Sequence, residues 1–459
     1  MKSKVEAYLT YLFFLITLTS SYYIGVAFYD ISTGLDFNKY RKNLYFFNDL
    51  GPEVYDSQGT LYFWSVSKIT RFTGTLFANQ ELSILLNNKL QLINFLYYLL
   101  GLLGLGILLK TKKFSFKQIL ISLSILNFFP PAYYMRLTMK PEVMAFALLP
   151  WLFLFCEFYI RKQTLFRTLL LSLFLSIALT IKASITGMIL LSLFVLYGRQ
   201  VIKLKSKLIL FIETTLFSSL IVYLNYVLTN VWLFAKPKIT DDSLLGKWDN
   251  TANLNFFVNV DFKNLYENPF KHIHAESFIS ITLIDTLSDY FTFFWKHEED
   301  GNFFHYGTVE FTDNFLIQNF LQEYLSIIFT LLFYLLIIFL FFKKVENSNY
   351  FLLPFCGLAI LIINAFGFPV KNFDPETGDL FKVHYYSFLL CISLVFLLSY
   401  LHKKYSYSYL LTILLIPIFL ITIGFPKQLQ DDTLNNLLTK IEYTSVCFVV
   451  NSIHDIQCK

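Results

Sequence analysis

Charged residues that could carry chemistry stand at the edges of apolar segments in a chain that is otherwise poor in charge. They are Asp36, Arg136, Lys140, Glu142, Lys182, Lys382 and His384. Carboxylates and cations gathered at one face of a membrane suit a reaction on a lipid phosphate. A cation stabilises a phosphate leaving group, and a carboxylate removes a proton from an attacking hydroxyl.

The composition predicts the kind of scaffold that must position these residues. The 459 residues are 56% hydrophobic, 19% aromatic and only 15% charged, whereas a soluble domain has about 25% charged residues. We therefore expect an all-α polytopic membrane protein. The net charge of +5 is divided among separate loops, so it does not indicate a nucleic-acid partner. Residues 7–28 lack a cleavage pattern and are expected to be a retained anchor.

The apolar segments predict about eleven transmembrane helices, because each span needs roughly 20 mostly apolar residues. They are residues 7–28, 88–109, 118–134, 141–159, 165–181, 183–198, 208–234, 319–342, 350–369, 383–401 and 407–424. With the N-terminus inside, basic residues concentrate in the short inner loops, as the positive-inside rule predicts. Among the acidic residues, only Glu6, Glu157, Glu213 and Glu346 fall inside or within helices.

This topology predicts one transmembrane domain, residues 1–424, with outer loops at 29–87 and 235–318 and an outer tail at 425–459. Residues 59–77 suit an interfacial helix, the alternative being an ordinary folded loop. The histidines and acids of loop 235–318 match no metal-binding spacing. We therefore expect no metal site there, although the outer acids leave room for a divalent ion. Cys447 and Cys458 lie in the outer tail, where a disulfide is plausible.

Several of the charged residues also have a purely structural explanation. Glu142 follows Pro141, which suits the start of a helix, and a carboxylate in the first turn is favoured by the helix dipole. Lys182 either extends to water from a turn or binds an anion. Lys382 and His384 belong either to an aromatic belt or to a phosphate site.

The chain resembles the C-type glycosyltransferase superfamily, and most of all its protein O-mannosyltransferase and lipid A aminoarabinose transferase branch. The resemblance rests on Asp36 with Tyr40, on residues 59–63, on Arg136 with Pro141-Glu142, and on residues 382–386. It covers residues 1–200 best and 370–400 weakly. The chain departs from the family at Phe37, where a second acid is frequent, and at Thr60, where proline is usual.

The resemblance implies inverting transfer of a sugar from a polyprenyl-phosphate donor to the hydroxyl of a lipid, glycan or protein acceptor. The implied general base is Asp36, with Asp30 as its competitor. Lys382 would hold the lipid phosphate together with Arg136, Lys140 or Lys182, while Tyr40, Glu142 and His384 would bind or orient substrate. The donor lipid supplies the activated bond, so no nucleotide motif is needed, and a divalent metal ion stays open as a cofactor. The implied location is a cell (inner) membrane, with the site on its periplasmic or extracellular face.

Other functions remain open at this point. A lipid-linked glycan polymerase or ligase would be expected to rely on outer arginines and histidines in a large loop, and residues 235–318 contain no arginine. A flippase or other transporter would place charges near the bilayer midplane. If the protein is a non-catalytic membrane subunit, the outer cations are expected to extend to water separately and not to share a site.

Overall fold

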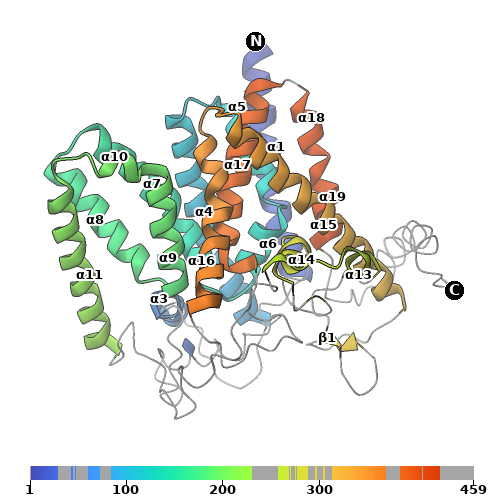
Figure 1. The fold of residues 1–459 in the computed structure, drawn as a ribbon, viewed down its shortest axis with the longest axis horizontal. Helices are drawn as coiled ribbons and strands as arrows, with labels where there is room; N and C mark the ends of the chain where they lie inside the picture. Colours follow the sequence, from blue (N-terminus) through green and yellow to red (C-terminus); the bar gives the residue numbers. More distant parts are fainter. Residues whose placement is uncertain are drawn as a thin grey trace.

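The computed structural model is a bundle of helices (Figure 1). It describes residues 2–28, 60–72, 84–229, 313–367, 383–405 and 407–423, with short pieces at 43–44, 47, 257–267, 269, 274, 277–287, 295–296 and 303–304. Seven helical segments in this part of the chain are long and apolar enough to cross a membrane. They are α1 (Lys2–Phe28), α4 (Ile84–Thr111), α7 (Glu142–Arg161), α9 (Ala183–Leu193) with its continuation, α11 (Lys207–Thr229), α15 (Asp313–Phe342) and α17 (Ser387–Lys404).

The other four predicted spans are also helical, but each is shorter or broken, so the count of eleven is not confirmed. They correspond to α5 (Phe116–Leu126), α8 (Leu165–Leu179), η4 (Ser348–Leu352) with α16 (Leu353–Gly367), and α18 (Ser408–Ile413) with α19 (Leu415–Ile423). The continuous helix predicted over 118–134 is wrong. The chain leaves the helix after α5, and α6 (Pro130–Leu137) begins at two prolines, which lack the N–H groups that a continuous helix needs.

The segments that connect the long helices contain short helices and a pair of short strands. α3 (Thr60–Phe72) lies within the segment predicted as an interfacial helix and buries one face against the bundle, including Tyr62, Phe63 and Val66. The connection over residues 235–318 contributes α13 (Phe262–Glu267), α14 (Phe278–Asp285) and the antiparallel strands β1 (Trp295–Lys296) and β2 (Phe303–Phe304). α17 is the most completely buried of the seven long helices and forms the centre of the core.

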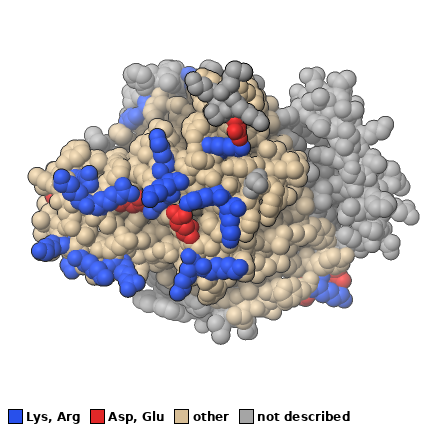
Figure 2. Space-filling model, turned by 90° about the horizontal axis from the view of Figure 1, so that it is seen from above, with Lys and Arg blue, Asp and Glu red and all other residues tan. Residues whose placement is uncertain are grey.

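Basic side chains gather on one end of the bundle, at the top of Figure 1, and spread over the face seen in Figure 2. Ion pairs there join separate helices, including Lys117 with Glu6 and Lys403 with Glu346. Most of these basic side chains come from the connections α4–α5, α7–α8, α9–α11 and α15–η4 and from the end of α17. They are Lys110, Lys112, Lys113, Lys117, Arg161, Lys162, Arg167, Arg199, Lys203, Lys205, Lys207, Lys343, Lys344, Lys403 and Lys404. We call this surface the basic end.

Helices α4 and α7 approach each other closely near the middle of both helices. Pro150 lies inside α7 and removes one internal hydrogen bond, because its nitrogen cannot donate to the carbonyl oxygen of Phe146. At this level α4 carries Gly101, and the Trp151 indole N–H donates to the carbonyl oxygen of Leu100 at 3.0 Å. A Cβ atom at Gly101 would lie 2.4 Å from the Phe146 ring and 2.8 Å from the Phe146 carbonyl oxygen.

We therefore expect Gly101→Ala to destabilise the protein by about 1–3 kcal/mol, because a methyl group forces two packed backbones apart. Gly106→Ala is the matched control in the same helix. Its added Cβ would find its nearest neighbours at 3.8 and 3.9 Å, an ordinary contact distance. Thermal unfolding of both variants in detergent should show a lower midpoint for Gly101→Ala alone, and equal midpoints would contradict the packing described.

Candidate functional site

The end of the bundle opposite the basic end contains the turn between α6 and α7. Thr138 ends α6, and Pro141 is the residue before α7 rather than its first residue, so the helix starts at Glu142. The sequence predicted this start to within one residue. Arg136, Lys140 and Glu142 are all buried here, with exposed fractions of 3%, 7% and 1%.

Glu142 and Lys182 form a buried ion pair that joins two helix starts. Lys182 is the residue before α9, and its Nζ donates to Glu142 Oε1 at 3.0 Å. Its side chain is 8% exposed, so it does not extend to water as one of the two sequence interpretations proposed. Within the described part of the chain, Glu142 Oε2 accepts no hydrogen bond. A buried carboxylate and ammonium need each other, because either charge alone is costly to remove from water.

The segment at the start of α17 meets this pair. The ammonium of Lys182 lies 4.5 Å from the centre of the Tyr385 ring, a cation–π distance. Tyr385 belongs to η5 (Val383–Tyr386), which also contains His384. The structure therefore brings together Glu142, Lys182 and the backbone of the segment that carries His384. The sequence analysis expected these three parts of the chain to lie close together. Their proximity depends on how α7, α8, α9 and α17 pack.

Arg136, which the sequence analysis assigned to a phosphate, contacts α1 in the structure. Its guanidinium donates to the Ser21 hydroxyl at 3.1 Å and to the Ser21 carbonyl at 2.8 Å. It also lies 4.6 Å from the centre of the Tyr133 ring and 5.4 Å from that of Tyr98. Burial lowers the pKa of Arg136 from its ordinary value. These contacts tie α6 to α1, so Arg136 has a structural role in this arrangement.

A chain of buried hydrogen bonds links α3 to the α6–α7 turn. Burial raises the pKa of the Tyr62 phenol, which therefore stays protonated and donates to Asn94 Oδ1 at 2.7 Å. Asn94 Nδ2 in turn donates to the Thr138 carbonyl at 2.9 Å. α3 is thereby fixed to the turn that begins α7, and the segment that carries Asp36 and Tyr40 is part of the same loop as α3.

Several predicted site residues lie outside the described residues: Asp30, Asp36, Tyr40 and Lys382, as do Cys447 and Cys458. For His384 only the backbone is described. Cys156, Cys356 and Cys391 are buried in helices as unpaired thiols, in agreement with their predicted placement. Among the described residues, no group of three or more His, Cys, Asp or Glu side chains is arranged to hold a metal ion.

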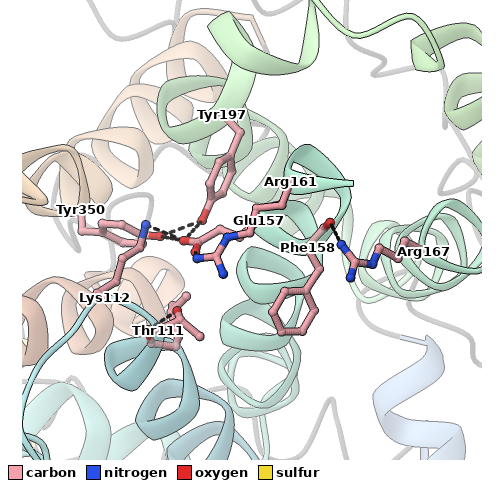
Figure 3. Close-up of polar contacts among 9 residues, drawn as sticks. Thr111, Lys112, Glu157, Phe158, Arg161, Arg167, Tyr197 and Tyr350 are labelled. Carbon is pink, nitrogen blue, oxygen red and sulfur yellow. Dashed lines mark hydrogen bonds and ion pairs between the residues drawn. The ribbon is translucent and has the colours of Figure 1, made fainter. Parts of the chain in front are cut away.

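Two polar clusters were missed by the sequence analysis. Asn94 was counted only as part of an apolar helix. Glu157 was noted only as an acid within a helix, yet it is the centre of a network at the basic end with Lys112, Arg161, Tyr197 and Tyr350 (Figure 3). A single ionisable residue inside an apolar helix is a signal for such a cluster, because it needs partners from neighbouring helices.

The seven long apolar helices define this chain as a multi-pass helical membrane protein. Comparisons with models of known protein families, with curated proteins and with solved structures found no match.

Proposed function

We propose that this protein is a membrane glycosyltransferase that moves a sugar from a polyprenyl-phosphate donor to an acceptor hydroxyl. The observation that supports the proposal best is the buried Glu142–Lys182 pair beside the Tyr385 ring. This pair holds a cation next to η5, which contains His384 and follows Lys382 in the sequence. Two cations from different helices at one membrane face suit the phosphate of a lipid donor.

The proposed topology is the eleven-span arrangement, with the basic end in the cytoplasm. Basic residues are retained on the cytoplasmic side of membrane proteins, and the basic side chains of this chain gather on one end of the bundle. The Glu142–Lys182 pair then faces the periplasm or the cell exterior. The membrane would be a cell (inner) membrane.

The proposed reaction is a single inverting displacement at the anomeric carbon. Asp36 accepts the proton of the acceptor hydroxyl as its oxygen bonds to that carbon. The bond between the carbon and the phosphate oxygen breaks, and its electron pair leaves with the lipid phosphate. Lys182 and Lys382 stabilise the leaving group. Of the three further cations expected at the phosphate, Lys182 suits the role best, since the two hydrogen bonds of Arg136 are made to α1. Lys140 remains a further candidate.

The remaining expected residues complete the substrate site. Glu142 keeps Lys182 charged and in place, and His384 and Tyr40 orient donor or acceptor. The hydrogen bonds from Tyr62 through Asn94 to Thr138 support the proposal further, because they attach the Asp36 loop to the turn that carries Glu142.

The direct test is sugar transfer by the purified full-length protein. The donors are polyprenyl-phosphate hexoses and pentoses, and the acceptors are hydroxyl-bearing lipids, glycans and peptides. Formation of a glycosylated acceptor with inverted anomeric configuration supports the proposal. Transfer with retained configuration, or no transfer from any donor by protein that unfolds cooperatively, would overturn it.

A further inference from the structure

A polar cavity lies at the basic end, away from the site proposed above. It has a volume of about 400 Å³, within the ~300–1,000 Å³ range of small-molecule sites. Its walls come from the end of α4, the end of α7, the segment Phe194–Gly198 and the connection between α15 and η4. The polar residues that line it include Lys112, Glu157, Arg161, Tyr197, Asn347 and Tyr350, with Gln200 and Asn349 beside them.

Glu157 is the buried anchor of this cavity. Its side chain is 8% exposed, and its Oε1 lies 2.5 Å from Lys112 Nζ. The same oxygen accepts hydrogen bonds from the hydroxyls of Tyr197 at 3.2 Å and Tyr350 at 3.1 Å. Arg161 reaches the second oxygen at 3.6 Å. The carboxylate is thus occupied by two cations and two hydroxyls and offers little to a ligand cation.

Three side chains that line the cavity have hydrogen-bond donors that are not used by the described residues of the protein. Lys112 is 22% exposed and Arg161 59% exposed, so both cations keep N–H groups that do not contact Glu157. Within the described part of the chain, Asn347 Nδ2 has no hydrogen-bond partner. Two cations against one carboxylate leave a net positive charge. These properties favour an anion with several acceptor oxygens.

The backbone around the cavity has two unusual features that position its walls. Tyr197 lies in the π-helix η1 (Phe194–Gly198), and such segments are frequent at functional sites. Asn347 adopts a left-handed conformation with φ of 62°, which asparagine tolerates better than most residues. Tyr350 is fixed by stacking on Phe396, with ring centres 3.9 Å apart.

We infer that this cavity binds a phosphate ester, with Arg161, Lys112 and Asn347 donating to the phosphate oxygens. Glu157 positions the two cations and does not contact the ligand. The phosphate belongs either to the headgroup of an anionic lipid or to a soluble metabolite, because both carry the same chemistry to the basic end of a membrane protein. The inference does not depend on the proposed glycosyltransferase activity.

The test is binding to the full-length protein in two arms. One arm measures binding of glycerol 3-phosphate to protein in phosphatidylcholine nanodiscs. The other measures retention of phosphatidylglycerol by native mass spectrometry. Saturable binding in the first arm assigns a soluble ester, and selective retention in the second assigns a lipid. We expect Arg161→Gln and Asn347→Asp each to weaken the observed binding by about tenfold, since each alters a contact to a charged group.

Lys162→Gln is the matched control, because it removes a neighbouring exposed cation that does not line the cavity. Arg161 is largely exposed and aspartate also tolerates the Asn347 conformation, so both test variants should fold. The inference is supported if they lose binding and Lys162→Gln does not. It is overturned if the wild-type protein binds neither probe, or if all three variants lose binding equally.

Discussion

Asp36→Asn is expected to lower the rate of sugar transfer by about 10²–10⁴-fold, the usual contribution of a general base. Asparagine has nearly the same shape as aspartate but cannot accept the proton of the acceptor hydroxyl. The loss should fall on kcat, with a small effect on KM, because the base acts in the transition state and contributes little to binding of the donor. Initial rates of transfer at saturating donor measure the effect.

Asp30→Asn is the matched control, because Asp30 is the other acid near the start of the same loop. Its rate of transfer should stay within about threefold of the wild-type rate, a much smaller change than the loss of a general base would cause. Full activity of Asp36→Asn would contradict the proposed mechanism. A loss in Asp30→Asn with none in Asp36→Asn would transfer the base role to Asp30.

Glu142→Ala is expected to lower the free energy of unfolding by about 3–5 kcal/mol, the cost of leaving one member of a buried ion pair without its partner. Lys182 would then keep a buried ammonium beside the Tyr385 ring without the carboxylate that pairs with it. Unfolding in detergent measures the change. Glu346→Ala is the control, since its pair with Lys403 is 55% and 39% exposed, and exposed pairs contribute at most about 1 kcal/mol. Equal effects of the two variants would contradict the buried pair.

The double variant Glu142→Met with Lys182→Met separates stability from function. Replacing both charges by apolar side chains removes the cost of the unpaired ion, so stability should return to within about 1–2 kcal/mol of the wild type. Sugar transfer should remain low, because no cation is left at this position to hold the donor phosphate. Recovery of both stability and transfer would show that the pair is structural.

The apolar helices could be predicted from the sequence because their length and composition are local properties. The predicted segments correspond to helices, and Pro130 and Pro131 mark the start of α6. The break over residues 127–129 within one predicted span was missed, since the segment remains hydrophobic across it. Hydropathy measures the environment that a segment prefers and does not report whether its helix is continuous.

The charged residues were identified more easily than their partners. Glu142 and Lys182 are forty positions apart, and only the packing of α7 against α8 and α9 brings them to 3.0 Å. Arg136 was assigned to a ligand because a buried arginine and a phosphate-binding arginine look alike in sequence. Its partner, Ser21, carries no charge and gives no pattern that a sequence could reveal.

The proline in α7 has a consequence for communication between the two ends of the molecule. Glu142 and Glu157 lie at opposite ends of this helix, about 22 Å apart at 1.5 Å per residue. A helix with a missing internal hydrogen bond would ordinarily bend there, and its halves would move independently. The close contact of Gly101 with Phe146 and the hydrogen bond from Trp151 brace α7 against α4 at that weak point. The two halves of α7 are therefore held against the same neighbouring helix on either side of the proline. If the proposed donor site and the proposed phosphate site are coupled through α7, thermodynamic linkage requires that each ligand change the affinity of the other by the same factor.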